Sequence, residues 1–495
     1  MIASDVLNEA SPRAARRYAL EPAVAVVGSY ASPEGVAAGL ARISRDATPV
    51  SELVRQAVED TGLARRRNEN IIYEYGHSSI AEGAVFGVAI QDIPRSLSID
   101  LVAHRLASYT QLSYRYVPVE RVPLPFFLPR EFRDGRARTI FEEAVERAWD
   151  LYTALYERLT AHLVASGAVR SEAMARRRAT EDARYALPLA QSTQLGMTAN
   201  ARVWGHVIAR LLSHPLSEGQ ALGERLKETL QPLAPSLFPA KYIHALPFPG
   251  SALDALRSLA GSLPTTPAMA MAEEGNSPPS RDGVTLVDYD PRGEERLAAA
   301  LLFRVTDLDA SARAALAARL SAEERAALIQ ASFSGMAAHD AALRELETLT
   351  YTVEIVHSEA CYHQFIRHRM ATQAAQPRGG ALGYTVPPAV EEAGCIAIYR
   401  EGMAVLEDAF DRLGGDERAS IMLGNGHNRR TLLHLNAREL IELSRLRADK
   451  HAQWEVRDRT RAIVALVEAV HPAVARACGG RDAFKAGQVR VTSDE

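Results

Sequence analysis

The sequence has few cysteines and no long apolar run. It holds 3 cysteines in 495 residues, Cys361, Cys395 and Cys478, which is too few for a disulfide framework, and their spacing matches no zinc motif. No apolar stretch approaches the ~18 residues of a membrane-spanning helix. The formal net charge is only −4, so bulk binding of nucleic acid is not expected. These absences predict a cytoplasmic protein that contacts neither membranes nor nucleic acid and holds no metal.

What is present is an ordinary globular composition. Apolar residues make up 47% and charged residues 24% of the chain, a balance that can form substantial cores. Since domains usually span ~100–200 residues, we expect two or more of them. Residues 1–21 lack an apolar signal core and are expected to form a flexible tail.

A sequence pattern that occurs twice indicates how the chain is divided. An apolar, helix-like run ends at His104 and opens into a polar segment, and a second such run ends at His368. The other paired features are short apolar strands within 24–33 and 284–291 and the Asn-Ala-Arg triplets that begin at Asn200 and Asn436. Because their order is the same in both halves, we predict two homologous domains.

The predicted boundaries follow the two copies. We place the first domain at 22–250, a linker rich in Pro, Ser and Gly at 251–283, and the second domain at 284–495. Hydrophobic periodicity predicts further strands at 84–90 and 349–356 and helices at 35–43, 138–165, 172–186, 203–213, 294–303 and 440–470.

Each copy places cations at the end of its apolar run. Arg367 and Arg369 flank His368, and their guanidinium groups suit bidentate phosphate binding. The first copy has Ala103 in place of the first cation, although Ser113 and Arg115 follow. A polar helix end whose side chains are satisfied locally is the alternative, and the duplication makes it less favourable.

Two further segments carry polar residues at suggestive spacing. Ser79 and Glu82 have the spacing of a capping box, so simple helix capping is expected there, although a helix start can also bind an anion. The second-copy counterpart is taken as 339–344, which lacks both the hydroxyl and the acid. In the closing helix, Arg447, His451 and Glu455 are spaced to share one face, with a solvated charge stripe as the alternative.

Taken together, these motifs resemble the flavin-dependent thymidylate synthases, whose signature reads Arg-His-Arg-x-x-Ser-x-Asn-x-x-Ser-x-Arg-Tyr. The first copy departs from it at Ala103 and Thr110, and the second has Thr372 for the first Ser and loses the Ser-x-Arg-Tyr end. The positions that the first copy keeps are His104, Arg105, Ser108, Ser113, Arg115 and Tyr116. The resemblance covers about residues 22–245 and 284–475.

The resemblance implies a fold and a reaction. The fold would be α+β, with two homologous domains that each contain an antiparallel sheet flanked by long helices. The reaction would be reductive methylation of dUMP to dTMP, with methylenetetrahydrofolate as carbon donor and FAD, reduced by NADPH, as the source of hydride. In that family each active site is assembled from several subunits of a homotetramer.

The resemblance also implies roles for single residues. The implied cofactor-binding residues are His77, Ser79, Glu82, Asn200, Arg202, Arg367, His368, Arg369, Asn436 and Arg438. The implied substrate-binding residues are Arg115, Arg184, Gln364, Arg447 and Gln453. Ser113 and His451 are the implied catalytic residues, and whether Ser113 attacks the base or only positions it stays open.

The losses in the two copies are complementary. The first keeps Ser113, Arg115 and Arg184, whereas the second keeps the Arg-His-Arg triplet and Arg447. We therefore predict composite sites with residues from both domains, in a homodimer of the duplicated chain. The alternatives are a flavin enzyme acting on a different nucleotide, because the nucleotide-side pattern is altered, and a non-catalytic protein that binds a nucleotide or flavin.

Overall fold

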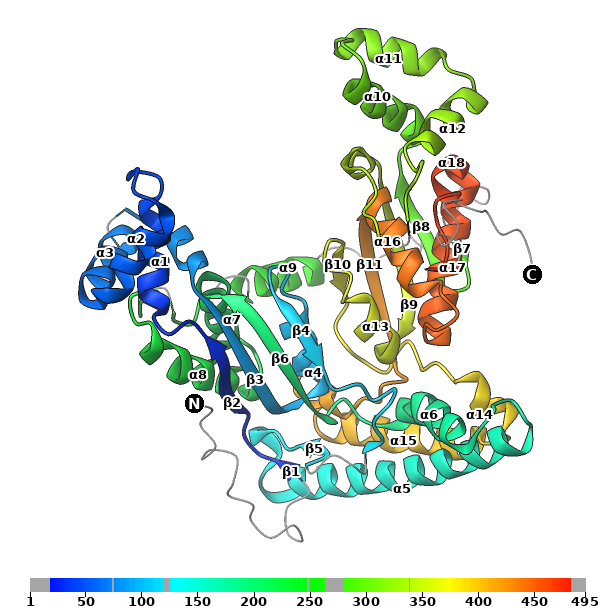
Figure 1. Ribbon diagram of the computed structural model, residues 1–495. Helices are drawn as coiled ribbons and strands as arrows, with labels where there is room; N and C mark the ends of the chain where they lie inside the picture. Colours follow the sequence, from blue (N-terminus) through cyan, green and yellow to red (C-terminus); the bar gives the residue numbers. More distant parts are fainter. Residues whose placement is uncertain are drawn as a thin grey trace. The chain divides into compact units, whose positions relative to one another are not determined.

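The computed structural model describes residues 18–73, 75–119, 124–241, 243–246, 250–262, 280–337 and 339–481. Most of the predicted tail and of the predicted linker lies outside these residues. The beginning of that linker is helical, because Gly250–Ser262 forms α9, none of whose residues is buried. The described residues fall into two compact units (Figure 1). Unit 1 holds the chain up to α9 together with Val386–Gly424, and unit 2 holds the remainder.

Unit 1 is built on a four-stranded antiparallel sheet with the strand order β2-β3-β6-β4. Its strands are β2 (Ala23–Ser29), β3 (Val85–Pro94), β6 (Ser192–Asn200) and β4 (Ser108–Gln111). Along β3 buried and partly exposed residues alternate, as expected for a strand with one face on the core. A bulge near Asp92, whose φ is 57°, shifts the register between Ile90 and Ile93.

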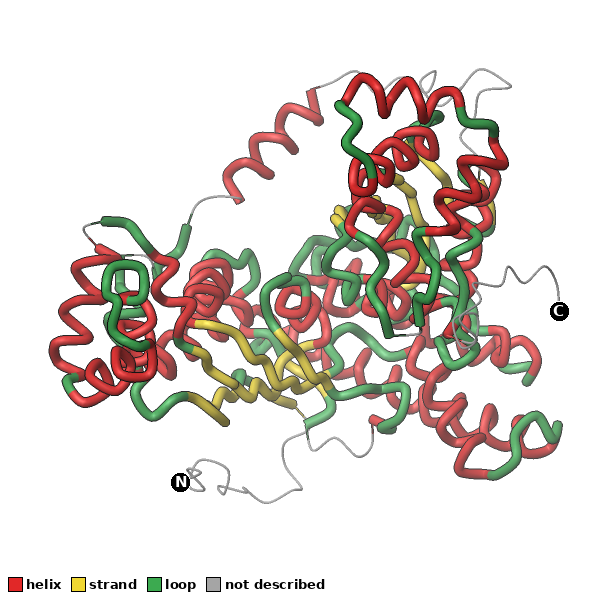
Figure 2. Tube along the Cα trace, turned by 45° about the horizontal axis from the view of Figure 1, so that its top comes forward, coloured by secondary structure: helices red, strands yellow, loops and turns green. Residues whose placement is uncertain are grey.

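The helices of unit 1 cover the sheet and extend beyond it (Figure 2). They are α1 (Pro33–Arg42), α2 (Val50–Glu59), α3 (Thr61–Tyr73), α4 (Arg95–Val102), α5 (Gly135–Ala165), α6 (Glu172–Ala183), α7 (Ala201–Leu212) and α8 (Ser217–Leu230). A minor pair of parallel strands joins β1 (Tyr18–Ala19) to β5 (Phe126–Phe127). Helices α1 and α2 approach closely at Gly39, where an added Cβ would lie only 2.6 Å from the Cα of Val54. Glycine permits this approach because it has no side chain.

A segment of the second sequence copy belongs to unit 1. It forms α14 (Pro388–Glu392) and α15 (Ile396–Arg412), and α15 packs along α5. The amides of Leu189 and Ala190 donate to the carbonyls of Leu423 (2.9 Å) and Ile421 (2.8 Å). This part of unit 1 is therefore made from both halves of the sequence.

Unit 2 repeats the sheet with the strand order β10-β11-β9-β8-β7, again antiparallel. The strands are β7 (Ser280–Arg281), β8 (Val284–Tyr289), β9 (Thr350–Ser358), β10 (Thr372–Ala375) and β11 (Asn428–Asn436). The helices are α10 (Gly293–Val305), α11 (Ala310–Arg319), α12 (Ala322–Ala331), α13 (Glu359–Phe365), α16 (Ala437–Arg447), α17 (Trp454–Val470) and α18 (Pro472–Ala475).

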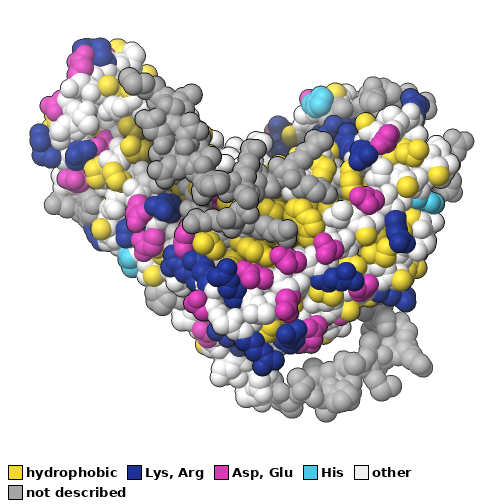
Figure 3. All heavy atoms as spheres, turned by 90° about the horizontal axis from the view of Figure 1, so that it is seen from below, with side chains coloured by type: hydrophobic (Ala, Val, Ile, Leu, Met, Phe, Trp, Pro, Cys, Tyr) yellow, Lys and Arg dark blue, Asp and Glu magenta, His cyan; other side chains and the backbone are white. Residues whose placement is uncertain are grey.

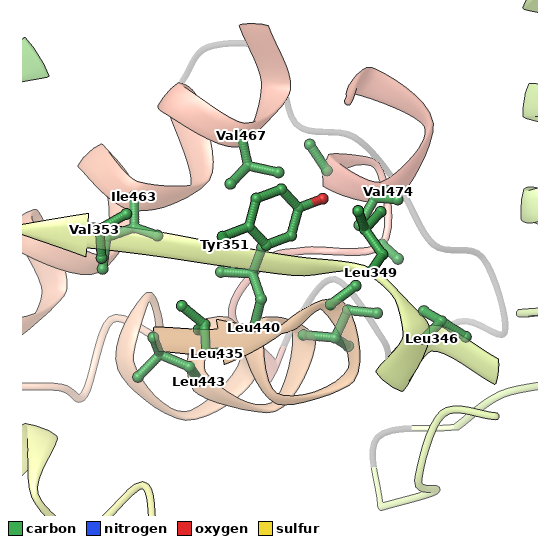
Figure 4. Close-up of a cluster of buried hydrophobic side chains, with 14 of the residues drawn as sticks. Leu346, Leu349, Tyr351, Val353, Leu435, Leu440, Leu443, Ile463, Val467 and Val474 are labelled. Carbon is green, nitrogen blue, oxygen red and sulfur yellow. The ribbon is translucent and has the colours of Figure 1, made fainter. Parts of the chain in front are cut away.

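The core of unit 2 lies between its sheet and its closing helices. Tyr351 of β9 is buried among apolar side chains of α16, α17 and α18, including Leu440, Val467 and Val474 (Figure 4). Its hydroxyl lies 3.1 Å from Nδ1 of His471, so the one polar atom of this ring is satisfied. Burial of this layer fixes α16, which carries several of the candidate site residues.

The strand registers show that the two sheets are equivalent. Val85 lies opposite Asn200 in unit 1, and Thr350 lies opposite Asn436 in unit 2. Both asparagines begin a helix, and the Oδ1 atom of each accepts a backbone N–H at 2.9 Å. The predicted α+β fold, with two antiparallel sheets flanked by helices, is confirmed. The predicted single helix at 440–470 is wrong, because the chain breaks between α16 and α17.

Candidate functional sites in the two units

His368 is the centre of a buried polar chain in unit 2. The Nδ1 atom of His368 lies 3.1 Å from Oε1 of Glu439, and Nε of Arg447 donates to Nε2 of His368 at 2.9 Å. An atom that accepts from a guanidinium carries no proton, so His368 is neutral with its proton on Nδ1. Burial lowers the pKa of His368 below its ordinary value, which agrees with this protonation state.

Two glutamines join this chain to the next helix. Arg447 also donates to the carbonyl of Gln364 at 3.3 Å, and the Gln364 amide donates to Oε1 of Gln453 at 3.3 Å. The same Oε1 atom accepts the backbone N–H of Val456 at 3.2 Å and so caps α17. Unit 2 therefore brings together four residues predicted from the sequence, Gln364, His368, Arg447 and Gln453.

Asn436 and Arg438 line a pocket of about 170 Å³ at the start of α16, together with Glu439 and Met370. Arg438 forms an ion pair with Glu347 at 2.7 Å and donates to the carbonyl of Ala342 at 2.8 Å. Hydrogen bonds from Arg344 and Arg438 lower the pKa of Glu347. The pocket thus offers both cationic and anionic groups to a ligand.

The position of Glu347 corrects one expectation. Glu82 precedes Val85 by three residues and pairs with Arg202 in unit 1, and Glu347 precedes Thr350 by three residues and pairs with Arg438. The counterpart of Glu82 is therefore Glu347, and the expectation that the second copy lacks this acid was wrong. Residues 339–344 were taken as the counterpart because the second copy does not repeat the motif around Ser79. The equivalent position can be identified only from the strand register.

The residues predicted on the closing helix separate in the structure. His451 is exposed in the turn between α16 and α17, and its backbone N–H donates to Asp449 at 2.9 Å. Glu455 is buried instead of solvated and accepts the backbone N–H of Ser358 at 2.8 Å as well as its hydroxyl. The prediction that Arg447, His451 and Glu455 share one helical face is wrong, because residues 448–453 are not helical.

Arg367 and Arg369 occupy the turn between α13 and β10, on either side of buried His368. Both residues are partly exposed, whereas the histidine between them is buried. Their roles in cofactor binding remain predictions.

The equivalent histidine of unit 1 has different surroundings. His104 follows α4 as His368 follows α13, but Leu211 and Val203 stand where unit 2 has Arg447 and Glu439. Burial, and then the charge of Arg210, lower the pKa of His104 to about 4. His104 is therefore neutral at physiological pH without an arginine donor from the equivalent position.

His77, Ser79 and Glu82 lie at the surface around the short 3₁₀ helix Ser78–Gly83. This helix has no side-chain capping bond, so the predicted capping box is not formed. Glu82 forms an ion pair with Arg202 instead. Unit 1 therefore brings Glu82 and Arg202 together. The roles of His77, Ser79, Glu82, Asn200 and Arg202 as cofactor ligands stay predictions.

A cluster of arginines surrounds Glu181 of α6 in unit 1. Nε of Arg115 forms an ion pair with the Glu181 carboxylate at 2.9 Å, and Nε of Arg184 donates to the Glu181 carbonyl at 3.1 Å. Ser113 accepts the backbone N–H of Arg115 at 3.4 Å within the same turn. The structure therefore places the three first-copy residues Ser113, Arg115 and Arg184 around one helix end.

Sequence reasoning missed two acids of these sites, Glu439 and Glu181. Glu439 is the third residue after Asn436, lies in the first turn of α16 and contacts His368. Glu181 lies three residues before Arg184. Each is a carboxylate one turn from a predicted site residue on the same helix, and that spacing could have indicated both.

Two negative findings concern the described residues. No group of three or more His, Cys, Asp or Glu side chains that could hold a metal ion occurs among them. Within the same ranges, none of the helices has the length and apolar character needed to cross a membrane. On the face shown in Figure 3, Lys and Arg side chains lie among Asp and Glu side chains.

Comparison with known proteins identifies the family. A family model described as thymidylate synthase complementing protein matches residues 26–236 and 285–473, which together are more than half of the chain. The chain therefore belongs to this family, and the two matched segments fit a tandem duplication.

Individual relatives match one copy-sized stretch of the chain. A flavin-dependent thymidylate synthase of Clostridium tetani is 32% identical over 209 residues, which are 42% of this chain and 81% of the relative. The flavin-dependent thymidylate synthase of Mycobacterium tuberculosis H37Rv is 37% identical over 171 residues, 34% of this chain and 66% of the relative. A solved UMP/dUMP methylase from Streptomyces cacaoi, bound with 5-Br dUMP, is 23% identical with a TM-score of 0.33 over 44% of this chain and 93% of its own.

Proposed function

We propose that this protein methylates dUMP to dTMP as a flavin-dependent thymidylate synthase. The observation that carries the proposal is that each copy of the family fold keeps a different part of the family's polar residues as a connected cluster. In unit 2 the cluster is the chain through His368 and Arg447, and in unit 1 it is the arginine cluster at Glu181.

The residues of unit 2 fit a flavin dinucleotide. Arg367 and Arg369 are partly exposed residues, and guanidinium groups suit a diphosphate. The adjacent pocket combines Arg438 with carboxylates that can accept hydrogen bonds from ribose hydroxyls. FAD, when bound, would supply the hydride chemistry, with NADPH as reductant and methylenetetrahydrofolate as carbon donor.

The chain's own residues would then bind and orient the substrate. Neutral His368 accepts from Arg447 and so holds that guanidinium in one orientation. Arg115 and Arg184 carry positive charge suited to a nucleotide phosphate. Because the kept residues are complementary between the copies, we also propose that a working site uses both copies, within one chain or across a homodimer. The cytoplasmic location predicted from the sparse cysteines stays a prediction.

Anaerobic stopped-flow spectroscopy tests this function. The purified protein is reduced with NADPH and mixed with methylenetetrahydrofolate with or without dUMP, while flavin absorbance and dTMP are followed. We expect flavin oxidation and dTMP formation that depend on dUMP. A yellow protein that ignores dUMP but responds to another nucleotide would favour the altered-substrate alternative. A protein that binds no flavin would favour the non-catalytic one.

A matched pair of variants links the assay to the site. Arg447→Ala removes the guanidinium held by His368, whereas Arg461→Ala removes an exposed arginine of the next helix, α17. We expect turnover to fall only in Arg447→Ala, by on the order of tenfold or more. Equal losses in both variants would indicate general damage to unit 2 and not the loss of a site residue.

A further inference from the structure

Glu359 is a buried acid at the start of α13 in unit 2. It is only 2% exposed, and its backbone N–H donates to the carbonyl of His427 at 2.9 Å. Arg378, from the loop after β10, pairs with the Oε1 atom of Glu359 at 3.2 Å, and Arg429 of β11 lies 3.6 Å from the same atom. Two cations therefore converge on one carboxylate oxygen.

The two arginines are held in place but are not fully used by this carboxylate. Both side chains are largely buried, and the Cζ atom of Arg429 lies 4.8 Å from the centre of the Tyr362 ring. Each arginine contacts the carboxylate through a single nitrogen, Nε of Arg378 and Nη1 of Arg429. A larger oxyanion could bind such a pair through several oxygens at once, which is the stronger arrangement.

The strand registers show that three positions changed together between the two copies. They are Arg95, Tyr114 and Thr193 in unit 1, and Glu359, Arg378 and Arg429 in unit 2. Where unit 1 has a single cation, unit 2 has two cations around an anion, so the formal charge of the three positions is +1 in each unit. The sign of the central charge is reversed while the total is kept.

Stability alone does not explain this exchange. A buried ion pair is often no more stabilising than apolar side chains of similar volume. Unit 1 shows this simpler replacement at the positions of Glu439 and Arg447, where Val203 and Leu211 are buried. Two arginines around one carboxylate are instead the composition of an anion site whose anion belongs to the chain itself.

We propose that Glu359 is an internal anion that closes an anion site in unit 2, formed by Arg378 and Arg429, by occupying the place of a phosphate group. The chain then has one place for a substrate phosphate, at Arg115 and Arg184 of unit 1, and binds one nucleotide per chain. This stoichiometry rests on the proposed function, whereas the closed anion site in unit 2 does not.

Removal of the carboxylate tests the proposal. Glu359→Ala leaves both arginines in place and frees the volume of the side chain. In isothermal titration we expect it to bind one inorganic phosphate per chain more than the wild type, and at least about tenfold more tightly than the wild type binds any such additional phosphate. Phosphate should also raise the melting temperature of Glu359→Ala more than that of the wild type.

Two further proteins serve as controls. Glu354→Ala removes an equal charge from β9 at a partly exposed residue that pairs with Arg430, and it should match the wild type in both measurements. The double variant Glu359→Ala/Arg378→Ala should lose the additional phosphate, because one of the two cations is gone. Retention of that phosphate in the double variant would overturn the assignment of the site.

Other outcomes separate this proposal from the proposed function. Glu359→Ser opens the same space and is the second variant if Glu359→Ala is too unstable to purify, and no additional phosphate in either would overturn the internal anion. A wild type that binds more than one dUMP per chain would overturn the closed site, even if dTMP is produced. If Glu359→Ala gains the phosphate while the wild type fails to methylate dUMP, the internal anion stands and the reaction is wrong.

Discussion

Removing the Glu439 carboxylate should disturb His368 and Arg447 in a predictable way. Without it, the buried Nδ1–H of His368 loses the acceptor that lies 3.1 Å away. An unsatisfied buried donor costs about 1–3 kcal/mol, so Glu439→Ala should lower the free energy of unfolding by about 2 kcal/mol. The imidazole could then move its proton to Nε2, which would end the 2.9 Å hydrogen bond from Arg447.

The effect on binding follows from this tautomer change. Arg447 would lose the acceptor that fixes its guanidinium group, and we expect dUMP to bind about tenfold more weakly. Glu439→Gln provides the rescue, because its amide oxygen can still accept from Nδ1–H. It should keep most of the stability and most of the dUMP affinity.

Chemical denaturation and calorimetric titration of both variants provide the test. The control is Glu442→Ala on the same helix, whose carboxylate is 46% exposed and pairs with Arg445 at 3.4 Å. A surface pair of this kind contributes about 0–1 kcal/mol. If Glu439→Gln loses as much as Glu439→Ala, the carboxylate acts through its charge and not as an acceptor. If Glu439→Ala matches Glu442→Ala, the polar chain has no role.

Three further predictions concern cofactor, pH and assembly. Arg367→Ala should purify with little flavin, and full occupancy in the absorbance spectrum would contradict the assignment. The pKa of His104 is about 4, below its ordinary value of 6.5, so the unfolded state takes up the proton at a higher pH than the folded state. The free energy of unfolding should therefore fall by up to about 3 kcal/mol as the pH falls from 6.5 to 4. His104→Gln should reduce this pH dependence in denaturation experiments. A chain of residues 1–264 lacks Val386–Gly424, which belongs to unit 1. Calorimetry should give this chain a lower melting temperature than the full chain, and equal melting temperatures would refute the prediction.

Strands and long helices with a clear pattern could be predicted from the sequence. The apolar stretch at 84–90 corresponds to β3, and the periodic stretch at 138–165 corresponds to α5. Strands β6 and β11 were not predicted, although buried and exposed residues alternate in both. The apolar residues of their buried faces are Leu, Met and Ala, which favour helices more than strands. The break after Arg447 was missed because 448–453 contains no Gly or Pro to mark it.

The site residues could be predicted only where a motif preserved them. Gln364, His368 and Arg447 were predicted together and lie in one hydrogen-bonded chain. Their partner Glu439 could not be found from the motif, because its role depends on α16 packing beside the turn that carries His368. Likewise, the contact between Arg177 and the Tyr116 ring could not be predicted, because it depends on α6 packing beside the turn that carries Tyr116.

The two copies have lost their polar residues by different physical routes. In unit 1 the positions of Glu439 and Arg447 are taken by Val203 and Leu211, which are buried. Apolar replacements leave no charge to satisfy.

In unit 2, Glu359 follows β9 where Arg95 follows β3, and buried Glu359 pairs with Arg378 at 3.2 Å and with Arg429 at 3.6 Å. Here a charge was kept, and both arginines pair with the same carboxylate oxygen, Oε1. The other oxygen, Oε2, is buried with no hydrogen-bond partner among the described residues. Arg184 in unit 1 resembles this case, because its Nε donates to the Glu181 carbonyl while its buried Nη2 has no hydrogen-bond partner among the described residues. Both copies therefore keep buried polar atoms that no described residue satisfies. A ligand can satisfy such atoms, which agrees with the proposal that a working site uses residues of both copies.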